Sequence, residues 1–263
     1  MGQNIKGNSI TEGVIWKQLL IFFFPILIGT FFQQLYNTVD TIIVGQYVGT
    51  HALAAVGTTG TLINLLVGFF VGVSSGATVI ISQFFGGGDW KNLSKAVHTS
   101  IALALAGGAA VMVLGLLTAG PALMLLGVPE EIMGDALLYL DIYYGGIIFC
   151  MVYNVGTGVL RAIGDSRMPL YVLIVCCLVN IVLDLLFVVA FHWGVMGVAL
   201  ATVLSQVASA LLVMLRLMCT KESYRVEPRH IRFDRGILKN VIRIGLPAGL
   251  QSVMYSFSNL VIQ

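Results

Sequence analysis

Charged side chains are scarce in this sequence. Lys, Arg, Asp and Glu together make up 10% of the 263 residues, whereas 58% are hydrophobic. Ordinary soluble domains have about a quarter of their residues charged, so the composition excludes a soluble globular protein. Apolar runs of about 20 residues are long enough to cross a bilayer as helices. Such runs lie at residues 17–46, 53–84, 95–127, 135–160, 169–191 and 195–218, and a seventh begins near residue 241.

Basic residues are missing from alternate connections between these runs. All 14 Lys and Arg residues lie at or beside the start of the first run, the second connection, the fourth connection or the sixth. The other connections have none, and Glu130, Glu131 and Asp135 occur at one of them instead. Cytoplasmic loops of membrane proteins are enriched in Lys and Arg. The sequence therefore predicts an all-α, multi-pass protein of the cytoplasmic (plasma) membrane, with its N-terminus inside.

Cysteine and the common catalytic motifs are also sparse or missing. The four cysteines have no metal-type spacing, and neither HExxH nor GxSxG occurs. The nearest approach to the GxGD pattern of membrane aspartyl proteases is Ala162-Ile163-Gly164-Asp165, which lacks the first glycine and lies in a basic connection. Basic segments beside the membrane follow from topology and do not indicate nucleic-acid binding. We therefore expect neither an enzyme nor a nucleic-acid-binding protein, and no cofactor beyond a coupling ion.

Two carboxylates lie in the apolar runs with no Lys or Arg to neutralise them. A helical rise of 1.5 Å per residue places Asp40 in the first run and Asp184 in the fifth about 10 Å from the outer end. Thr202 in the sixth run comes out at the same level. An ionised group at this depth is costly, and removal from water favours the neutral form of a carboxyl group. The layer predicts a site for a small monovalent cation such as Na⁺, or for a proton.

Further polar residues share helix faces with this layer. Asn180 precedes Asp184 by one turn, and residues three or four apart lie on the same side of a helix. Hydrogen bonding between helices remains an alternative role for the amides and hydroxyls. Residues expected to support the site or line a cavity are Gln33, Gln34, Asn37, Tyr139 and Tyr143.

Proline inside the first run predicts a kinked helix. Pro25 has no backbone N–H, and its ring clashes with the preceding turn. A kink there could bend further when Asp40 changes state, or it could be static; the sequence leaves both alternatives open.

Residues 219–240 form a polar, basic stretch that divides the chain. We expect an N-terminal six-helix lobe at 1–218, a cytoplasmic linker at 219–240 and the start of a second lobe at 241–263. Apolar residues between 231 and 242 recur at helical spacing, which predicts an amphipathic helix along the inner membrane surface. A shift of 222 residues superimposes Pro247 on Pro25, a weak repeat of the kind found in two-lobe transporters. We therefore expect a second lobe of similar size to follow.

Five segments resemble one known family. They are VDTIIVGQYVGTHALAAVG (39–57), GGGDWKNLSKAV (86–97), LRAIGDSRMPL (160–170), GVMGVALATVLSQ (194–206) and RIGLPAGLQ (243–251). In this order and spacing the sequence resembles the multidrug and toxic compound extrusion family of secondary transporters. The resemblance implies twelve helices in two lobes around a central cavity. It also implies export of organic, often cationic, drugs or toxic metabolites in exchange for Na⁺ or H⁺.

By the same resemblance, Asp40, Asn180, Asp184 and Thr202 form the cation site of the N-terminal lobe, with Na⁺ as the metal if the ion is not a proton. The implied partners are a small-molecule substrate, membrane lipid and a second six-helix lobe. The chain is too short to contain that lobe, and Ile262 stands where a counterpart of Asp40 would lie. The alternative is a flippase of lipid-linked saccharides or other lipids. It is less favoured because a phosphate-binding cavity needs positive charge, and Lys and Arg occur only at the cytoplasmic ends of the runs, not in their middle.

Overall fold

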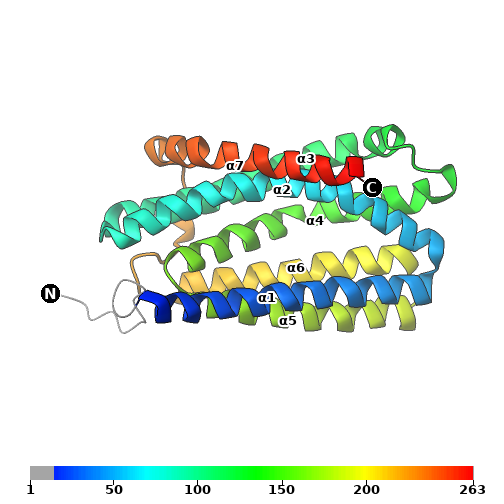
Figure 1. Ribbon diagram of the computed structural model, residues 1–263, viewed down its shortest axis with the longest axis horizontal. Coiled ribbons are helices and arrows are strands. Elements are labelled where there is room, and N and C mark those ends of the chain that lie inside the picture. The colour runs from blue at the N-terminus through cyan, green and yellow to red at the C-terminus, as the bar shows by residue number, and fades with distance from the viewer. Residues whose placement is uncertain (1–14, 263) are drawn as a thin grey trace.

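The computed structural model describes residues 15–262, which form long helices and no strand (Figure 1). Two π-helical segments extend the first and fifth helices, η1 (Val44–Val48) and η2 (Leu185–Ala190), and a 3-10 turn η3 (Pro228–His230) precedes the last. The α-helices are α1 (Ile15–Ile43), α2 (Thr50–Gly86), α3 (Trp90–Leu125), α4 (Glu130–Ala162), α5 (Arg167–Asp184), α6 (Gly194–Cys219) and α7 (Arg235–Ile262).

Six of these helices, α1 to α6, are long and apolar enough to cross a membrane. Their limits lie within a few residues of the apolar runs, apart from longer polar ends on α3 and α4. The predicted all-α, multi-pass fold is therefore confirmed. In the described residues α7 does not meet the same criterion. We call the end of the bundle that holds the Lys and Arg residues the basic end, and the other the opposite end.

Short turns make successive helices antiparallel. The α2–α3 turn contains Gly88 at φ 69°, a left-handed conformation that favours glycine. Asp89 then caps α3, because its carboxylate accepts hydrogen bonds from the side chain of Asn92 at 2.7 Å and from its backbone N–H at 3.2 Å. These hydrogen bonds hold the pKa of Asp89 below its ordinary value. The cap fixes where α3 begins.

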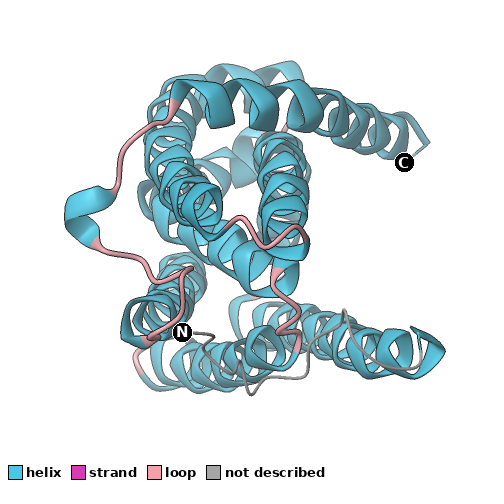
Figure 2. Cartoon of the chain, turned by 90° about the vertical axis from the view of Figure 1, so that its left-hand side faces the viewer, coloured by secondary structure: helices cyan, strands magenta, loops and turns pink. Residues whose placement is uncertain are grey.

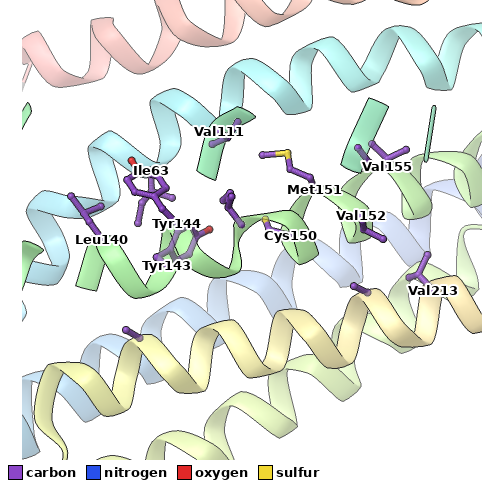
Figure 3. Packing of buried hydrophobic residues seen from close by; sticks show 14 of the residues in the cluster. Ile63, Val111, Leu140, Tyr143, Tyr144, Cys150, Met151, Val152, Val155 and Val213 are labelled. Carbon is purple, nitrogen blue, oxygen red and sulfur yellow. The ribbon is translucent and has the colours of Figure 1, made fainter. Parts of the chain in front are cut away.

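Helix α4 forms the centre of the bundle. It packs against α2 and α3 on one side and α6 on the other, while α5 covers α6 and α1 covers α5 (Figures 1 and 2). Buried side chains of α4 such as Tyr144, Met151 and Val152 belong to one apolar cluster with Val111 of α3, Ile63 of α2 and Val213 of α6 (Figure 3). Helices α1 and α7 lie at the two edges, so each has a broad exposed face.

The contact between α2 and α7 is close along its length. A Cβ atom added to Gly72 of α2 would lie 2.5 Å from Cα of Gly249. Side chains other than hydrogen therefore cannot fit there without separating the helices, as in small-residue packing between membrane helices.

The predicted amphipathic helix over residues 231–242 is not a separate element. Residues from Arg235 onward are the first turns of α7, and Asp234 caps them by accepting hydrogen bonds from the N–H groups of Gly236 and Ile237 at 3.0 and 3.1 Å. Ile237 and Val241 are buried against the bundle. The apolar face predicted to lie on lipid packs on protein instead, so α7 begins inside the segment assigned to the linker.

Helix α1 continues as one α-helix through Pro25. A bend at that residue during function stays a prediction.

Candidate functional site

Both intramembrane acids lie where an α-helix changes into a π-helix. Asp184 is the last residue of α5 and η2 follows at once, while Asp40 lies in the last turn of α1 before η1. The wider turns are closed by hydrogen bonds five residues apart, from Gly49 N–H to Val44 at 3.1 Å and from Phe191 N–H to Leu186 at 3.0 Å. Single π turns within α-helices are frequent at functional sites. η1 and η2 also contact each other and α6.

The structure brings the four predicted cation-site residues together. Asn180 and Asp184 are fully buried, Thr202 is 4% exposed and Asp40 is partly buried. The carboxyl groups of Asp40 and Asp184 are neighbours across α1 and α5. Tyr139 of α4 adjoins both acids and Thr202. We call Asp40, Tyr139, Asp184 and Thr202 the acid layer.

No basic group neutralises the acid layer. Each ion pair found in the described part of the chain lies at the basic end: Lys95 with Asp234, Arg216 with Asp165, and His230 with Glu227. Two neighbouring carboxylates that are both ionised repel each other and are poorly solvated in a buried place. The acid layer therefore needs a bound cation or a proton to be stable in this arrangement.

The layer also lacks internal hydrogen bonds. Among the side chains that the structure describes, the buried nitrogen and oxygen atoms without a hydrogen-bond partner all belong to α1, α5 and α6 around this layer. Most buried polar groups in native proteins are paired, so such a cluster requires an explanation. The atoms are Asp40 Oδ1, Asn180 Nδ2 and Oδ1, Asp184 Oδ1 and Oδ2, Thr202 Oγ1 and Gln206 Oε1.

Six of these seven atoms are oxygens. Hydroxyl, amide and carboxylate oxygens are the ligands that hard cations prefer. Within the described residues no three His, Cys, Asp or Glu side chains come together as a metal-binding group. The donor set therefore suits a small monovalent cation or a proton better than a transition metal.

The predicted supporting residues divide into two groups. Tyr139 and Tyr143 are buried and stack with ring centroids 6.3 Å apart. Gln33, Gln34 and Asn37 are exposed on α1, where Asn37 Nδ2 donates to Gln34 Oε1 at 3.4 Å. The structure thus places Tyr139 in the acid layer with Tyr143 stacked beside it, and the side-chain amides of α1 on an exposed helix face. The function of each residue stays a prediction.

Sequence reasoning missed two residues of the cluster, Tyr36 and Gln206. Tyr36 lies beside Thr202 and Asp40, and Gln206 Oε1 is one of the unpaired atoms. A detectable signal was available, because Tyr36 precedes Asp40 by four residues and Gln206 follows Thr202 by four. Residues at that spacing share a helix face.

Residues 25–186, which include both acids, match the model of the MatE family. The chain belongs to the MatE family. This confirms the resemblance found in the sequence. Among curated relatives, it is 29% identical over 255 residues to the probable multidrug resistance protein YoeA and 30% identical over 250 residues to the probable multidrug resistance protein YpnP, both of Bacillus subtilis (strain 168). The alignments cover 94% and 95% of this chain.

The fold of this MatE chain also matches solved structures. One is a multidrug resistance MATE family transporter of the MOP superfamily in an outward-facing conformation, with a TM-score of 0.91, 28% sequence identity and 98% of this chain covered. The match covers 57% of that transporter. The chain likewise spans about half the length of the curated relatives, 55% of YoeA and 56% of YpnP. The MatE chain thus corresponds to one part of those longer proteins.

Proposed function

We propose that this chain is the ion-binding lobe of a cation-coupled antiporter that exports organic, often cationic, drugs or toxic metabolites. The observation that carries the proposal is the cluster of buried, unpaired oxygens around Asp40 and Asp184. The curated relatives YoeA and YpnP are named as probable multidrug resistance proteins, which supports drug export. The cluster contains no Lys or Arg that could bind the phosphate of a lipid-linked saccharide. The flippase alternative is therefore not favoured.

The proposed membrane is the plasma membrane, with the N-terminus in the cytoplasm. Support comes from the concentration of Lys and Arg at the basic end, since such residues are retained on the cytoplasmic side. The acid layer then lies in the outer half of the membrane, where Na⁺ or H⁺ arrives from outside down its gradient.

We propose that ion binding is coupled to transport through α1, which lies at the edge of the bundle. Helix α1 carries Asp40 and packs mainly against α5, which carries Asp184. With both carboxylates charged, repulsion between them favours moving α1 away from α5. A cation or proton shared by the two acids removes that repulsion, so occupancy of the site and the position of α1 are linked. A second lobe would complete the cavity for the exported compound.

The proposal is tested by transport in vesicles. A full-length protein with this chain as its first half would be reconstituted, and export of a fluorescent organic cation would be followed under a sodium gradient alone, a proton gradient alone, and neither. We expect export with at least one gradient and none without. Export at the same rate in all three conditions would contradict cation coupling.

A further inference from the structure

A second polar layer lies one helical turn from the acid layer, toward the basic end. Helices α1, α4, α5 and α6 each contribute one residue to the acid layer and another, four positions away, to the second layer. The pairs are Asp40 and Tyr36, Tyr139 and Tyr143, Asp184 and Asn180, and Thr202 and Gln206. Four residues rise about 6 Å along a helix. We call Tyr36, Tyr143, Asn180 and Gln206 the amide layer.

Two residues of the amide layer, Tyr143 and Asn180, are buried, and the other two, Tyr36 and Gln206, are partly buried. Gln206 Nε2 donates to Tyr143 Oη at 3.3 Å, and the Tyr143 ring stacks on Tyr139 of the acid layer with an interplanar angle of 16°. The amide nitrogen of Gln206 is therefore used, while its carbonyl oxygen is buried and unpaired. Asn180 Oδ1, on the facing helix α5, is unpaired as well.

The chemistry of the two layers differs in one respect. The acid layer has two carboxylates, which accept either a proton or a metal cation. The amide layer has neutral carbonyl and hydroxyl oxygens, which bind a metal cation but do not take up a proton at physiological pH. A metal ion gains ligands from the amide layer, whereas a proton on Asp40 or Asp184 does not.

We propose that Gln206 is a specificity-determining residue, whose carbonyl oxygen makes this site bind an alkali-metal cation, Na⁺, in preference to a proton. The inference rests on the proposed function, because it assigns the coupling ion of the same site. In this proposal Na⁺ lies between the two acids and the amide layer. Gln206 Oε1 and Asn180 Oδ1 are its neutral ligands. Tyr143 is a positioning residue that holds the Gln206 amide in place.

The test uses Na⁺ itself as the probe. The thermal stability of the full-length protein with this chain as its first half is measured in detergent, against Na⁺ concentration at fixed pH and against pH in choline chloride. For Gln206→Leu we expect the half-saturating Na⁺ concentration to rise about tenfold or more, as for loss of one contact between a neutral polar group and a charged one. The pH response in choline should stay as in the wild type. The matched control is Gln83→Leu, at an exposed position of α2.

A second variant guards against misfolding of Gln206→Leu. Gln206→Glu keeps the size of the side chain and adds a titratable carboxyl group. We expect its Na⁺ affinity to become more strongly pH-dependent than that of the wild type, because protons then compete at both layers. Equal Na⁺ dependence in wild type, Gln206→Leu and Gln206→Glu would overturn the inference.

The outcomes separate this inference from the proposed function. A wild type stabilised by lower pH but not by Na⁺ would overturn the inference and leave a proton-coupled transporter. A wild type that responds to neither ion would overturn both. A Na⁺ response lost in Asp184→Asn but unchanged in Gln206→Leu would support the acid site and reject the role of Gln206.

Discussion

Two buried polar clusters in this bundle differ in how their atoms are satisfied. At the basic end, His98 and Thr99 of α3 are 5% and 1% exposed, and their side chains have partners. His98 Nδ1 lies 2.7 Å from the carbonyl oxygen of Ser94, and Nε2 accepts a hydrogen bond from the N–H of Glu227 at 3.0 Å. Toward the opposite end, the acid layer and the amide layer hold the unpaired atoms.

The partners of the basic-end cluster come from a segment distant in sequence. The hydroxyl of Thr99 accepts a hydrogen bond from the N–H of Asp234 at 3.2 Å. It also donates one to the carbonyl oxygen of Arg232 at 3.4 Å. The connection between α6 and α7 is thus attached to α3. Buried polar groups that satisfy one another hold the fold, whereas those left unpaired indicate a ligand. The difference predicts which substitutions change stability and which change ion binding.

The largest effect is expected at the acid layer. Asp184→Asn or Asp40→Asn should reduce ion-driven export by about 100-fold or more, since a buried charged ligand contributes about 3 kcal/mol. Membrane insertion and folding should persist, because the change removes a buried charge without a partner. Export and the amount of protein in the membrane are measured together, with Asp141→Asn at an exposed position of α4 as the control. Normal drug resistance in cells with either variant would count against the site.

Loss of the buried histidine should affect stability instead. His98→Phe leaves the N–H of Glu227 without an acceptor, so we expect the free energy of unfolding to fall by about 1–3 kcal/mol. The Na⁺ concentration for half-maximal stabilisation should not change. Thermal unfolding and proteolysis of residues 220–234 are suitable measurements, with the exposed His51→Phe as control. If the free energy of Na⁺ binding changed by more than the free energy of unfolding, the basic-end cluster would no longer differ from the ion-binding cluster in its role.

A smaller loss of stability is expected when only the hydroxyl of Thr99 is removed from the basic-end cluster. Thr99→Val keeps the shape of the side chain but no longer accepts the N–H of Asp234, so we expect about 1 kcal/mol of destabilisation. Thr118→Val is the control, because its exposed hydroxyl bonds only to Leu114 O in its own helix at 2.7 Å. The two variants are compared by unfolding in the same detergent. Equal stability would show that the attachment of the connection to α3 contributes little.

The cap of α7 should give a weak dependence of stability on pH. Hydrogen bonds from the N–H of Ile237 and a nearby Lys95 lower the pKa of Asp234. A lowered pKa means that the ionised cap contributes stability at pH above the ordinary carboxyl value, and that this contribution is lost as the pH falls through the lowered value. Asp234→Asn should therefore flatten the acid side of the stability profile below a pH of about 4. Glu130→Gln at the opposite end serves as control, and an unchanged profile for Asp234→Asn would refute the cap's contribution.

Much of the fold and part of the site could be predicted because depth in a membrane helix follows from residue number. The apolar runs and the rise per residue placed Asp40, Asp184 and Thr202 in one layer, and the structure has them together. Rotation of each helix about its axis was harder to predict. Gln33 and Asn37 were expected beside Asp40, yet they lie on the open face of α1, because that helix packs mainly on α5.

Long-range contacts of the connections were not predictable either. Nothing in the spacing around His98 shows that the N–H of Glu227 is its partner, because that pairing depends on how α6 and α7 are joined across the end of α3. The π turns after the two acids have no sequence signal of their own. In the structure η1 and η2 lie against α6 and against each other.

The smallest effect is expected at Arg161, the basic residue at the end of α4. Its guanidinium contacts the carbonyl oxygen and hydroxyl of Thr157 in its own helix at 3.3 and 3.0 Å, at the end of the bundle away from the acids. Arg161→Ala should therefore leave the half-saturating Na⁺ concentration unchanged, because exposed charges far from a site are screened by solvent and salt. Na⁺-dependent stabilisation measured beside Asp184→Asn checks this. A large loss of Na⁺ affinity in Arg161→Ala would show that the ion binds nearer the basic end, where polar groups are already paired, and the contrast between the clusters would fail.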